Sequence, residues 1–394
     1  MRRIRTASRM GPAIAALFLF MGMGGCGPSD PGDLPASPAS SQTAPPTEQL
    51  NAWIGQMLMV GFRGTRLEED DPFLVQLRDL HLGGTVLFDY DVASQSRLRN
   101  IQDADQVRGL SRQLRAAAGR PLLIAIDQEG GRIARLKPRH GFPPTLSQQE
   151  LAQLDEEERT RTQARQVAGL LSELGINVNF APVLDLNLHT ENPIIGALQR
   201  SYSADPEVVV RHARWTIEEF HKQGVLAAVK HFPGHGSSRQ DSHLGLPDVT
   251  SHWSQEELTP FARLIEESLP DMVMTAHLFN ARWDEERPAT LSPKVIQGIL
   301  RQRLGFQGVV VSDDLQMGAI SQRYGLEETL LKAVQAGVDI LVLANNTPDG
   351  YDPQIAAKAH AALRRLVDEG KLTPERLRLS AERIQRLHRK LGHN

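Results

Sequence analysis

Eight short apolar runs recur along the chain from about residue 50 onward, and longer stretches with a different periodicity separate them. Several of the runs are almost continuous in Val, Ile, Leu and Met, as expected for parallel strands that are covered on both faces. The longer stretches, such as 158–175 and 205–224, return to an apolar residue every three or four positions and end in glycine, which predicts helices. The strand candidates are residues 57–62, 83–88, 121–127, 177–185, 226–232, 271–277, 308–314 and 339–344.

This alternation of strands and helices predicts an α/β fold, and eight repeats of the unit favour a single (β/α)8 barrel of the TIM type. A doubly wound parallel sheet is the alternative. It is less favoured because the glycine-bearing segment DQEGGR, at 127–132, does not have the spacing of a phosphate-binding turn. The barrel is expected to occupy residues 50–394, in which a last helical stretch at 373–392 leaves no residues for a further domain.

The N-terminal residues have the composition of a secretory signal. Residues 1–10 are basic, and the apolar segment that follows is shorter than the roughly 20 residues a membrane-spanning helix needs. Cys26, the only cysteine in the chain, comes directly after two glycines, an arrangement that resembles the cleavage box of bacterial lipoproteins. We therefore expect a signal peptide at 1–25 and acylation of Cys26, with an ordinary signal peptide and an incidental cysteine as the alternative.

Residues 26–49 are rich in Pro, Ser and Ala and have no apolar period, which predicts an extended, disordered tether. An acylated Cys26 at its start would hold the protein on a membrane of the cell envelope. Gly27 rather than aspartate follows the cysteine, and in Gram-negative lipoproteins this favours the periplasmic side of the outer membrane. The predicted localisation is therefore that of a lipid-anchored protein of the bacterial cell envelope.

Composition and charge narrow the class of ligand. The 394 residues are 40% hydrophobic and 23% charged, which is enough apolar material for a large buried core. The formal net charge is −3 and neither sign gathers into a long run, so no electrostatic feature predicts a nucleic-acid partner. A small or uncharged ligand is favoured.

Ionisable residues gather at the carboxyl ends of five predicted strands. In a barrel of this type the loops after the strands converge at that rim, which is where active sites lie. Any one of these residues could instead cap the following helix, but their coincidence on five strands favours a functional rim. The residues are Asp127, Asp185, Lys230 with His231, His277, and Asp313 with Asp314.

Four short motifs lie at or just after these strand ends, namely DQEGGR at 127–132, KHFPGHG at 230–236, DSH at 241–243 and SDDLQM at 312–317. Together, and in this order, they resemble the motifs of glycoside hydrolase family 3, and in particular its β-N-acetylglucosaminidase branch. The resemblance covers the chain from about residue 50 to the end. It implies a barrel whose rim binds and hydrolyses a glycoside.

Retaining glycoside cleavage needs a carboxylate that attacks the anomeric carbon and a proton donor for the leaving oxygen. Asp313 and Asp314 are adjacent, and neighbouring strand residues point to opposite faces, so spacing alone does not choose between them. The resemblance implies that Asp313 is the nucleophile and leaves Asp314 as a helix cap or a partner of the nucleophile. It also implies that His243, paired with Asp241, is the acid/base, a role that suits an imidazole beside a carboxylate.

The resemblance also assigns residues to the sugar hydroxyls. In the motif after the fifth strand, Pro233, Gly234 and Gly236 would shape a mobile loop that delivers His243, and His235 would brace it. The implied substrate-binding residues are Asp127, Arg135, Arg200, Lys230 and His231.

The resemblance therefore implies a retaining exo-β-N-acetylglucosaminidase, without cofactor or metal, that removes N-acetylglucosamine from muropeptides or chitin-type glycans through a glycosyl-aspartate. A zinc site made by His231, His235, Asp241 and His243 is one alternative, and substrate-assisted cleavage by the acetamido group is another. A β-glucosidase of broader specificity and a non-catalytic glycan-binding lipoprotein are two more. The short chain disfavours the β-glucosidase, because such members usually carry a second domain that supplies a glutamate acid.

Overall fold

The computed structural model describes residues 45–392. The predicted signal peptide at 1–25, the predicted acylation site Cys26 and the predicted tether as far as residue 44 lie outside the described residues. Helix α1 (Thr47–Gln56) begins within the last residues of that tether, so regular structure starts slightly before the position expected from the apolar pattern.

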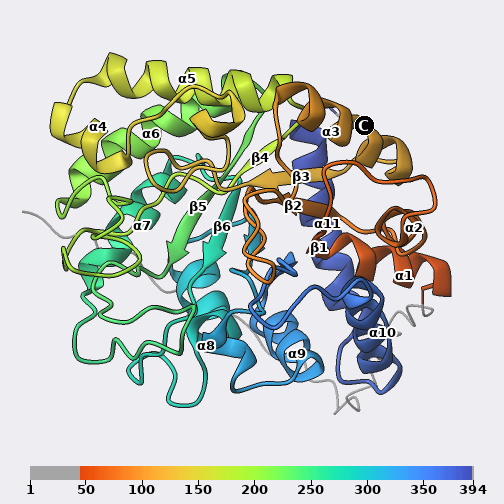
Figure 1. Ribbon diagram of the computed structural model, residues 1–394. Helices are drawn as coiled ribbons and strands as arrows, with labels where there is room; N and C mark the ends of the chain where they lie inside the picture. The colour runs from red at the N-terminus through yellow and green to blue at the C-terminus, as the bar shows by residue number, and fades with distance from the viewer. Residues whose placement is uncertain (1–44, 393–394) are drawn as a thin grey trace, which may run out of the picture. The chain divides into compact units, whose positions relative to one another are not determined.

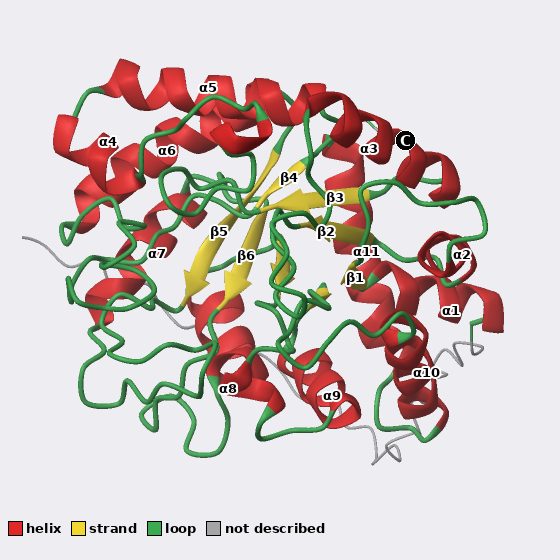
Figure 2. Ribbon diagram, in the orientation of Figure 1, coloured by secondary structure: helices red, strands yellow, loops and turns green. Residues whose placement is uncertain are grey.

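Eight parallel strands form the sheet at the centre of the structure (Figures 1 and 2). Neighbouring strands follow the chain from β1 to β7, and β8 pairs with β1. A parallel bridge between Val311 and Ile340 closes the ring, and Ser312 N donates a hydrogen bond to Ile340 O at 2.9 Å. The strands are β1 (Leu58–Gly61), β2 (Gly84–Leu87), β3 (Leu123–Ile126), β4 (Val178–Asn179), β5 (Leu226–Phe232), β6 (Met272–Thr275), β7 (Val309–Val311) and β8 (Leu341–Leu343).

All eight predicted strands are present, and the predicted (β/α)8 barrel is confirmed. The fourth strand differs most from its prediction, which spans 177–185. Pro182 has no N–H to donate, and this interrupts the ladder after the two residues of β4. Pairing with β5 resumes beyond it, where Val183 bridges Lys230 and Leu184 N donates to Lys230 O at 2.6 Å.

Helices alternate with the strands and lie around the sheet (Figure 2). Local signals explain several of their ends. Asp103 accepts the N–H of Gln106 at the start of α3, and Gly119 ends that helix in the left-handed conformation that glycine adopts without steric cost. The helices after α1 are α2 (Pro72–Asp79), α3 (Ala104–Ala118), α4 (Gln148–Leu154), α5 (Glu157–Glu173), α6 (Pro206–Lys222), α7 (Thr259–Glu266), the π-helix η4 (Lys294–Arg303), α8 (Gly318–Ser321), α9 (Leu326–Ala336), α10 (Ile355–Asp368) and α11 (Pro374–Lys390).

The strands are buried along their whole lengths, and β5 is buried from Leu226 to Phe232 although it contains Lys230 and His231. Burying a charge costs free energy unless the charge is paired, so the end of β5 requires polar partners. Within residues 45–392, no helix combines the length and the apolar character needed to cross a membrane.

Candidate active site

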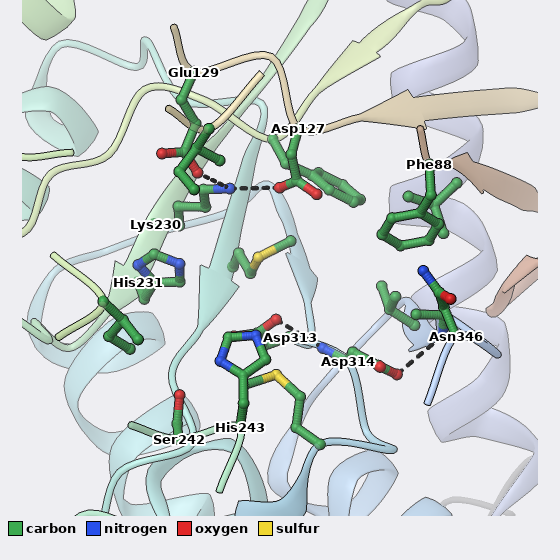
Figure 3. A pocket seen from close by; sticks show the side chains of 18 of the residues that line it. Phe88, Asp127, Glu129, Lys230, His231, Ser242, His243, Asp313, Asp314 and Asn346 are labelled. Carbon is green, nitrogen blue, oxygen red and sulfur yellow. Dashed lines mark hydrogen bonds and ion pairs between the residues drawn. The ribbon is translucent and has the colours of Figure 1, made fainter. Parts of the chain in front are cut away.

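A cavity of about 300 Å³ lies at the carboxyl ends of the strands (Figure 3). Its lining comes from the ends of strands and from the loops that follow them, as the position of ionisable residues in the sequence predicts. Asp241 is not part of the lining but is hydrogen-bonded to His243, which is. The predicted site residues in the lining are Asp127, Arg135, Arg200, Lys230, His231, His243 and Asp313.

Lys230, near the end of β5, lies at the centre of a buried set of charges. Its Nζ donates to Asp127 Oδ1 at 2.6 Å and pairs with Glu129 Oε1 at 2.6 Å (Figure 3), and its side chain is only 2% exposed. Both carboxylates reach it from the turn that directly follows β3. An ammonium group has three hydrogens. Within the described part of the chain, one of those hydrogens is left for a ligand.

Arg200 reaches Glu129 from the loop before α6. Its Nε donates to Glu129 Oε2 at 2.8 Å and its Nη2 to Glu129 Oε1 at 2.7 Å, which is a two-point pair. Nη1 donates to Ile194 O at 2.8 Å, and Nη2 also contacts His231 Nε2 at 3.2 Å. Burial raises the pKa of Glu129, but the charges of Arg200 and Lys230 outweigh it and leave that pKa below its ordinary value.

His231 follows Lys230 and extends the set of charges to a third carboxylate. Its Nδ1 lies 2.6 Å from Asp185 Oδ2, and burial together with Arg200 and Lys230 lowers the pKa of the ring to about 3. The neutral ring has one N–H. Because a guanidinium can only donate, His231 Nε2 accepts from Arg200 and Nδ1 donates to Asp185. Both ring nitrogens are therefore engaged with protein groups.

Arg135 completes the set on the side of Asp127. Its Nη2 donates to Asp127 Oδ2 at 3.2 Å, and its guanidinium lies 5.6 Å from the centre of the Phe88 ring. Its Nε is buried and has no hydrogen-bond partner among residues 45–392. Burial raises the pKa of Asp127, but Lys230 and Arg135 outweigh it and hold that pKa below the ordinary value.

Asp313 and Asp314 follow β7 and differ in what their carboxyl groups contact. Asp313 Oδ1 accepts the N–H of Asp314 at 2.8 Å and faces the cavity (Figure 3). Asp314 Oδ1 accepts the N–H groups of Gln316 at 3.1 Å and Ala344 at 3.0 Å. Asp314 thus joins the end of β7 to the end of β8, and Asp313 has the carboxylate that remains available to a ligand.

The two carboxyl groups also differ in charge state. Burial raises the pKa of Asp313, but His277, His231 and His243 outweigh it and leave the pKa below its ordinary value. Burial raises the pKa of Asp314 to about 6. At neutral pH, Asp313 is therefore the more firmly ionised of the two.

His277, at the end of β6, is one of the predicted rim residues and is fully buried. Its Nε2 donates to Asp314 O at 2.8 Å, and its Nδ1 lies 2.8 Å from Thr290 Oγ1. The ring fixes the backbone of the segment that carries Asp313.

Asp241 and His243 form a local pair on the loop after β5. Asp241 Oδ1 accepts from both His243 Nδ1 and His243 N, each at 2.8 Å. Since Nδ1 donates to the carboxylate, Nε2 remains for another partner. The His243 side chain is 63% exposed and, like Asp313, lines the cavity (Figure 3).

Several residues of the cavity are absent from the sequence-based site. Glu129 lies within the DQEGGR motif, two residues after Asp127, so its position offered a signal. Phe88, Tyr90 and Asn346 also line the cavity, but nothing in their local sequence indicates that role. Asn346 Nδ2 donates to Tyr90 O at 2.9 Å, so these two loops meet at the cavity.

The zinc alternative requires His231, His235, Asp241 and His243 to converge. Across residues 45–392, no group of three or more His, Cys, Asp and Glu side chains is arranged to hold a metal ion. His231 is held by Asp185 and Arg200, and His243 is paired with Asp241.

Comparison with known proteins covers almost the whole described region. Residues 49–387 match the sequence model of the Glycosyl hydrolase family 3 N terminal domain. The chain is 34% identical over 373 residues to beta-hexosaminidase A of Pseudoalteromonas piscicida, covering 86% of this chain and 60% of that protein. It is 36% identical over 318 residues to a beta-hexosaminidase of Tolumonas auensis, covering 78% of this chain and 90% of that protein.

Solved structures give the same picture. A glycoside hydrolase family 3 beta-N-acetylglucosaminidase from Paenibacillus superposes with a TM-score of 0.78 and 36% identity, covering 87% of this chain and 62% of that one. A beta-N-acetylhexosaminidase from Beutenbergia cavernae gives a TM-score of 0.75 and 28% identity, covering 87% of this chain and 98% of that one. The chain thus spans about 60% of the length of the first relative and nearly all of some others.

Proposed function

The chain belongs to glycoside hydrolase family 3, and on that basis we propose that it is a retaining exo-β-N-acetylglucosaminidase. It would release N-acetylglucosamine from the non-reducing end of a glycan. The proposal draws on the names of its relatives, which are beta-hexosaminidases and beta-N-acetylglucosaminidases. The chain's own geometry supplies the proposed catalytic roles.

One observation carries the proposal. Asp313, an ionised carboxylate, and His243, an imidazole whose Nε2 is not used by Asp241, line the same small cavity, as a nucleophile and a proton donor must. Buried charged side chains line part of the cavity, and its volume is small. Both features support binding of one terminal sugar rather than a long chain.

In the first step, Asp313 would attack the anomeric carbon while the protonated His243 gives its Nε2 proton to the glycosidic oxygen. The bond to the leaving group breaks as the ester between Asp313 and the sugar forms. Asp241 stabilises the imidazolium and fixes the tautomer through Nδ1.

In the second step, the neutral His243 would take a proton from water as the water oxygen attacks the anomeric carbon. The ester bond breaks, the sugar leaves with its original anomeric configuration, and Asp313 returns as a carboxylate. The low pKa of Asp313 favours its departure as an ion.

Sugar hydroxyls would be held by hydrogens that the buried charges leave unused. Lys230 has one such hydrogen, and the Nε of Arg135 is buried with no partner in the described chain. Asp127 can accept hydroxyl hydrogens on its remaining lone pairs. Arg200 and His231 are largely committed to Glu129 and Asp185, so we assign them to holding the others in place.

Muropeptides or chitin fragments are the natural substrates we propose, in line with an enzyme anchored at the cell envelope through an acylated Cys26. The anchor is testable by itself. Cys26→Ser should move the protein from the membrane fraction to the soluble fraction, whereas continued membrane association would count against acylation.

The test of the activity is hydrolysis of p-nitrophenyl β-N-acetylglucosaminide by the full-length protein, beside the matching β-glucoside, with Asp313→Asn as the control. We expect cleavage of the hexosaminide alone, loss of that activity in the variant, and β-N-acetylglucosamine as the first product seen by NMR. Preference for the glucoside would establish the broader β-glucosidase, and an α-product would exclude the retaining mechanism. Binding of the sugar without turnover would point to a glycan-binding protein.

A further inference from the structure

The loop that carries His243 has a fixed root. His235 N donates to Asp185 Oδ1 at 2.7 Å, and Gly236 N donates to Glu257 Oε2 at 2.9 Å. All of these groups are buried. The loop that the sequence predicts to be mobile therefore has its first residues packed into the barrel, so any movement is expected only in the residues after them.

The tip of the same loop is exposed, and its backbone has two contacts with another part of the barrel. The side chain of His243 is 63% exposed and Leu244 is 76% exposed. Ala319 N donates to Ser242 O at 3.1 Å, and Gln322 Nε2 donates to Leu244 O at 3.2 Å. These two hydrogen bonds hold the residues on either side of His243.

Gly318 leaves the space in which the tip lies. A Cβ at this position would be 2.5 Å from His243 O, closer than real Cβ atoms approach. Gly318 is the first residue of α8 and does not have a left-handed φ, so its backbone conformation does not itself require glycine. The close approach of the His243 carbonyl is what excludes a side chain.

The segment that receives the tip is the one that carries the nucleophile. Asp313 is followed by Asp314, whose carboxyl accepts the N–H groups of Gln316 and Ala344 and so braces the turn that leads to Gly318. One short turn, braced by the Asp314 carboxyl, thus connects the nucleophile Asp313 to Gly318, against which the loop tip packs. The position of the tip on this surface sets the position of the His243 ring relative to Asp313.

We propose that Gly318 and Gln322 are positioning residues that hold the His243 loop against the nucleophile segment and thereby keep the proton donor within reach of the glycosidic oxygen. This inference rests on the proposed function, in which His243 is the acid/base. Neither residue needs to touch the sugar, since both act through the backbone beside His243.

The variant that tests this is Gly318→Ala, with Gly325→Ala as the matched control. Apart from Gly325 itself and its chain neighbours, no atom of residues 45–392 lies within 4 Å of the Cβ that Gly325 would gain, and its φ of −69° suits alanine. The measurement is kcat/KM for a series of aryl β-N-acetylglucosaminides of rising leaving-group pKa. We expect Gly318→Ala to lose about 10-fold or more on the poorest leaving groups and to stay near wild type on dinitrophenol, since a good leaving group needs little protonation. Gly325→Ala should match wild type throughout.

A second pair of variants separates positioning from general damage. Gln322 is exposed, so Gln322→Ala should fold normally and show the same leaving-group dependence with a smaller loss. In a His243→Ala background, Gly318→Ala should cause no further loss, because the residue through which it acts is gone. Equal losses on all leaving groups, or additive losses in that background, would overturn the inference. If wild type cleaves the hexosaminides and His243→Ala shows the leaving-group dependence while Gly318→Ala does not, the inference fails and the proposed function stands.

Discussion

On the β3 to β5 side of the cavity, Lys230, Asp127 and Glu129 each contact at least two groups of opposite charge, and Lys230 is almost completely buried. On the opposite side, Asp241 and His243 form one pair, and most of the His243 side chain is in contact with water. The first side is an interlocked set of charges whose geometry is fixed before a ligand arrives. The second is a local pair on a loop tip held by two backbone hydrogen bonds.

The contrast matches the two tasks. Recognition of one sugar gains from donors and acceptors that are already oriented, because less order has to be created on binding. Proton transfer has to serve the leaving group in one step and water in the next, and an exposed imidazole can reach both. Substitutions on the buried side should therefore change folding and sugar binding together, whereas substitutions on the exposed side should change chemistry alone.

Asp313 is the proposed nucleophile, so its replacement should have the largest effect. We expect Asp313→Asn to lower kcat by about 10⁴-fold or more, as for a missing nucleophile, while the Kd for N-acetylglucosamine stays within a few-fold. Asp314→Asn is the matched control, and its loss should be far smaller because that carboxyl contacts backbone N–H groups. An inactive Asp314→Asn beside an active Asp313→Asn would reverse the two roles. Steady-state kinetics and calorimetric titration measure both quantities.

The buried side should respond to Glu129→Gln. The variant leaves Lys230 and Arg200 with one carboxylate fewer in a site that excludes water, and removing one member of a buried charge pair typically costs about 3–5 kcal/mol. Urea unfolding should show that loss, and KM should rise because both cations lose their alignment. Glu158→Gln, at an exposed position, is the control and should change neither quantity. Unchanged stability and KM in Glu129→Gln would mean that the charges on this side are not interdependent.

On the exposed side, His243→Ala should reduce turnover and leave stability unchanged. Unfolding free energy should stay within about 0.5 kcal/mol of wild type, because little of the side chain is buried. Turnover of poor leaving groups should fall about 10²-fold, and good leaving groups should be nearly unaffected in kcat/KM. His252→Ala, another exposed histidine, should leave all three unchanged. A uniform loss over all leaving groups would assign His243 to sugar positioning instead.

The barrel could be predicted because its signal is repeated. Eight apolar runs with helices between them have few alternative folds, and five of the runs end in ionisable residues that such a barrel brings to the same rim. The predicted strands are longer than the observed ones, most of all the fourth, since Pro182 breaks a ladder whose apolar pattern continues to Asp185.

The connections within the site could not be predicted because they join residues far apart in the chain. Spacing left Asp313 and Asp314 equivalent, and only the contact of Asp314 with Ala344, at the end of another strand, separates them. The role of His231 could not be predicted for the same reason, since its ring is held by Asp185 and Arg200 from two other loops. Which side chains are free for a ligand depends on such long-range pairs, and a local motif does not encode them.

Glu257 contacts the buried start of the loop that carries His243, and its replacement should have the smallest effect of these variants on activity. Its Oε2 accepts the N–H groups of Gly236 and Ser237, and burial raises its pKa to about 7 from an ordinary value of 4.5. The folded protein therefore keeps a proton that the unfolded chain has lost between about pH 4.5 and pH 7, so the contribution of Glu257 to the free energy of unfolding falls as pH rises through that window.

Glu257→Gln carries no such proton, and its stability relative to wild type should improve by about 3 kcal/mol between pH 4.5 and pH 8. Glu256→Gln, at the exposed neighbouring position, should follow the wild-type pH dependence. Urea unfolding of the three proteins across this pH range measures the difference. Parallel curves for wild type and Glu257→Gln would show that Glu257 titrates in the folded protein as it does in the unfolded chain, so that burial does not raise its pKa.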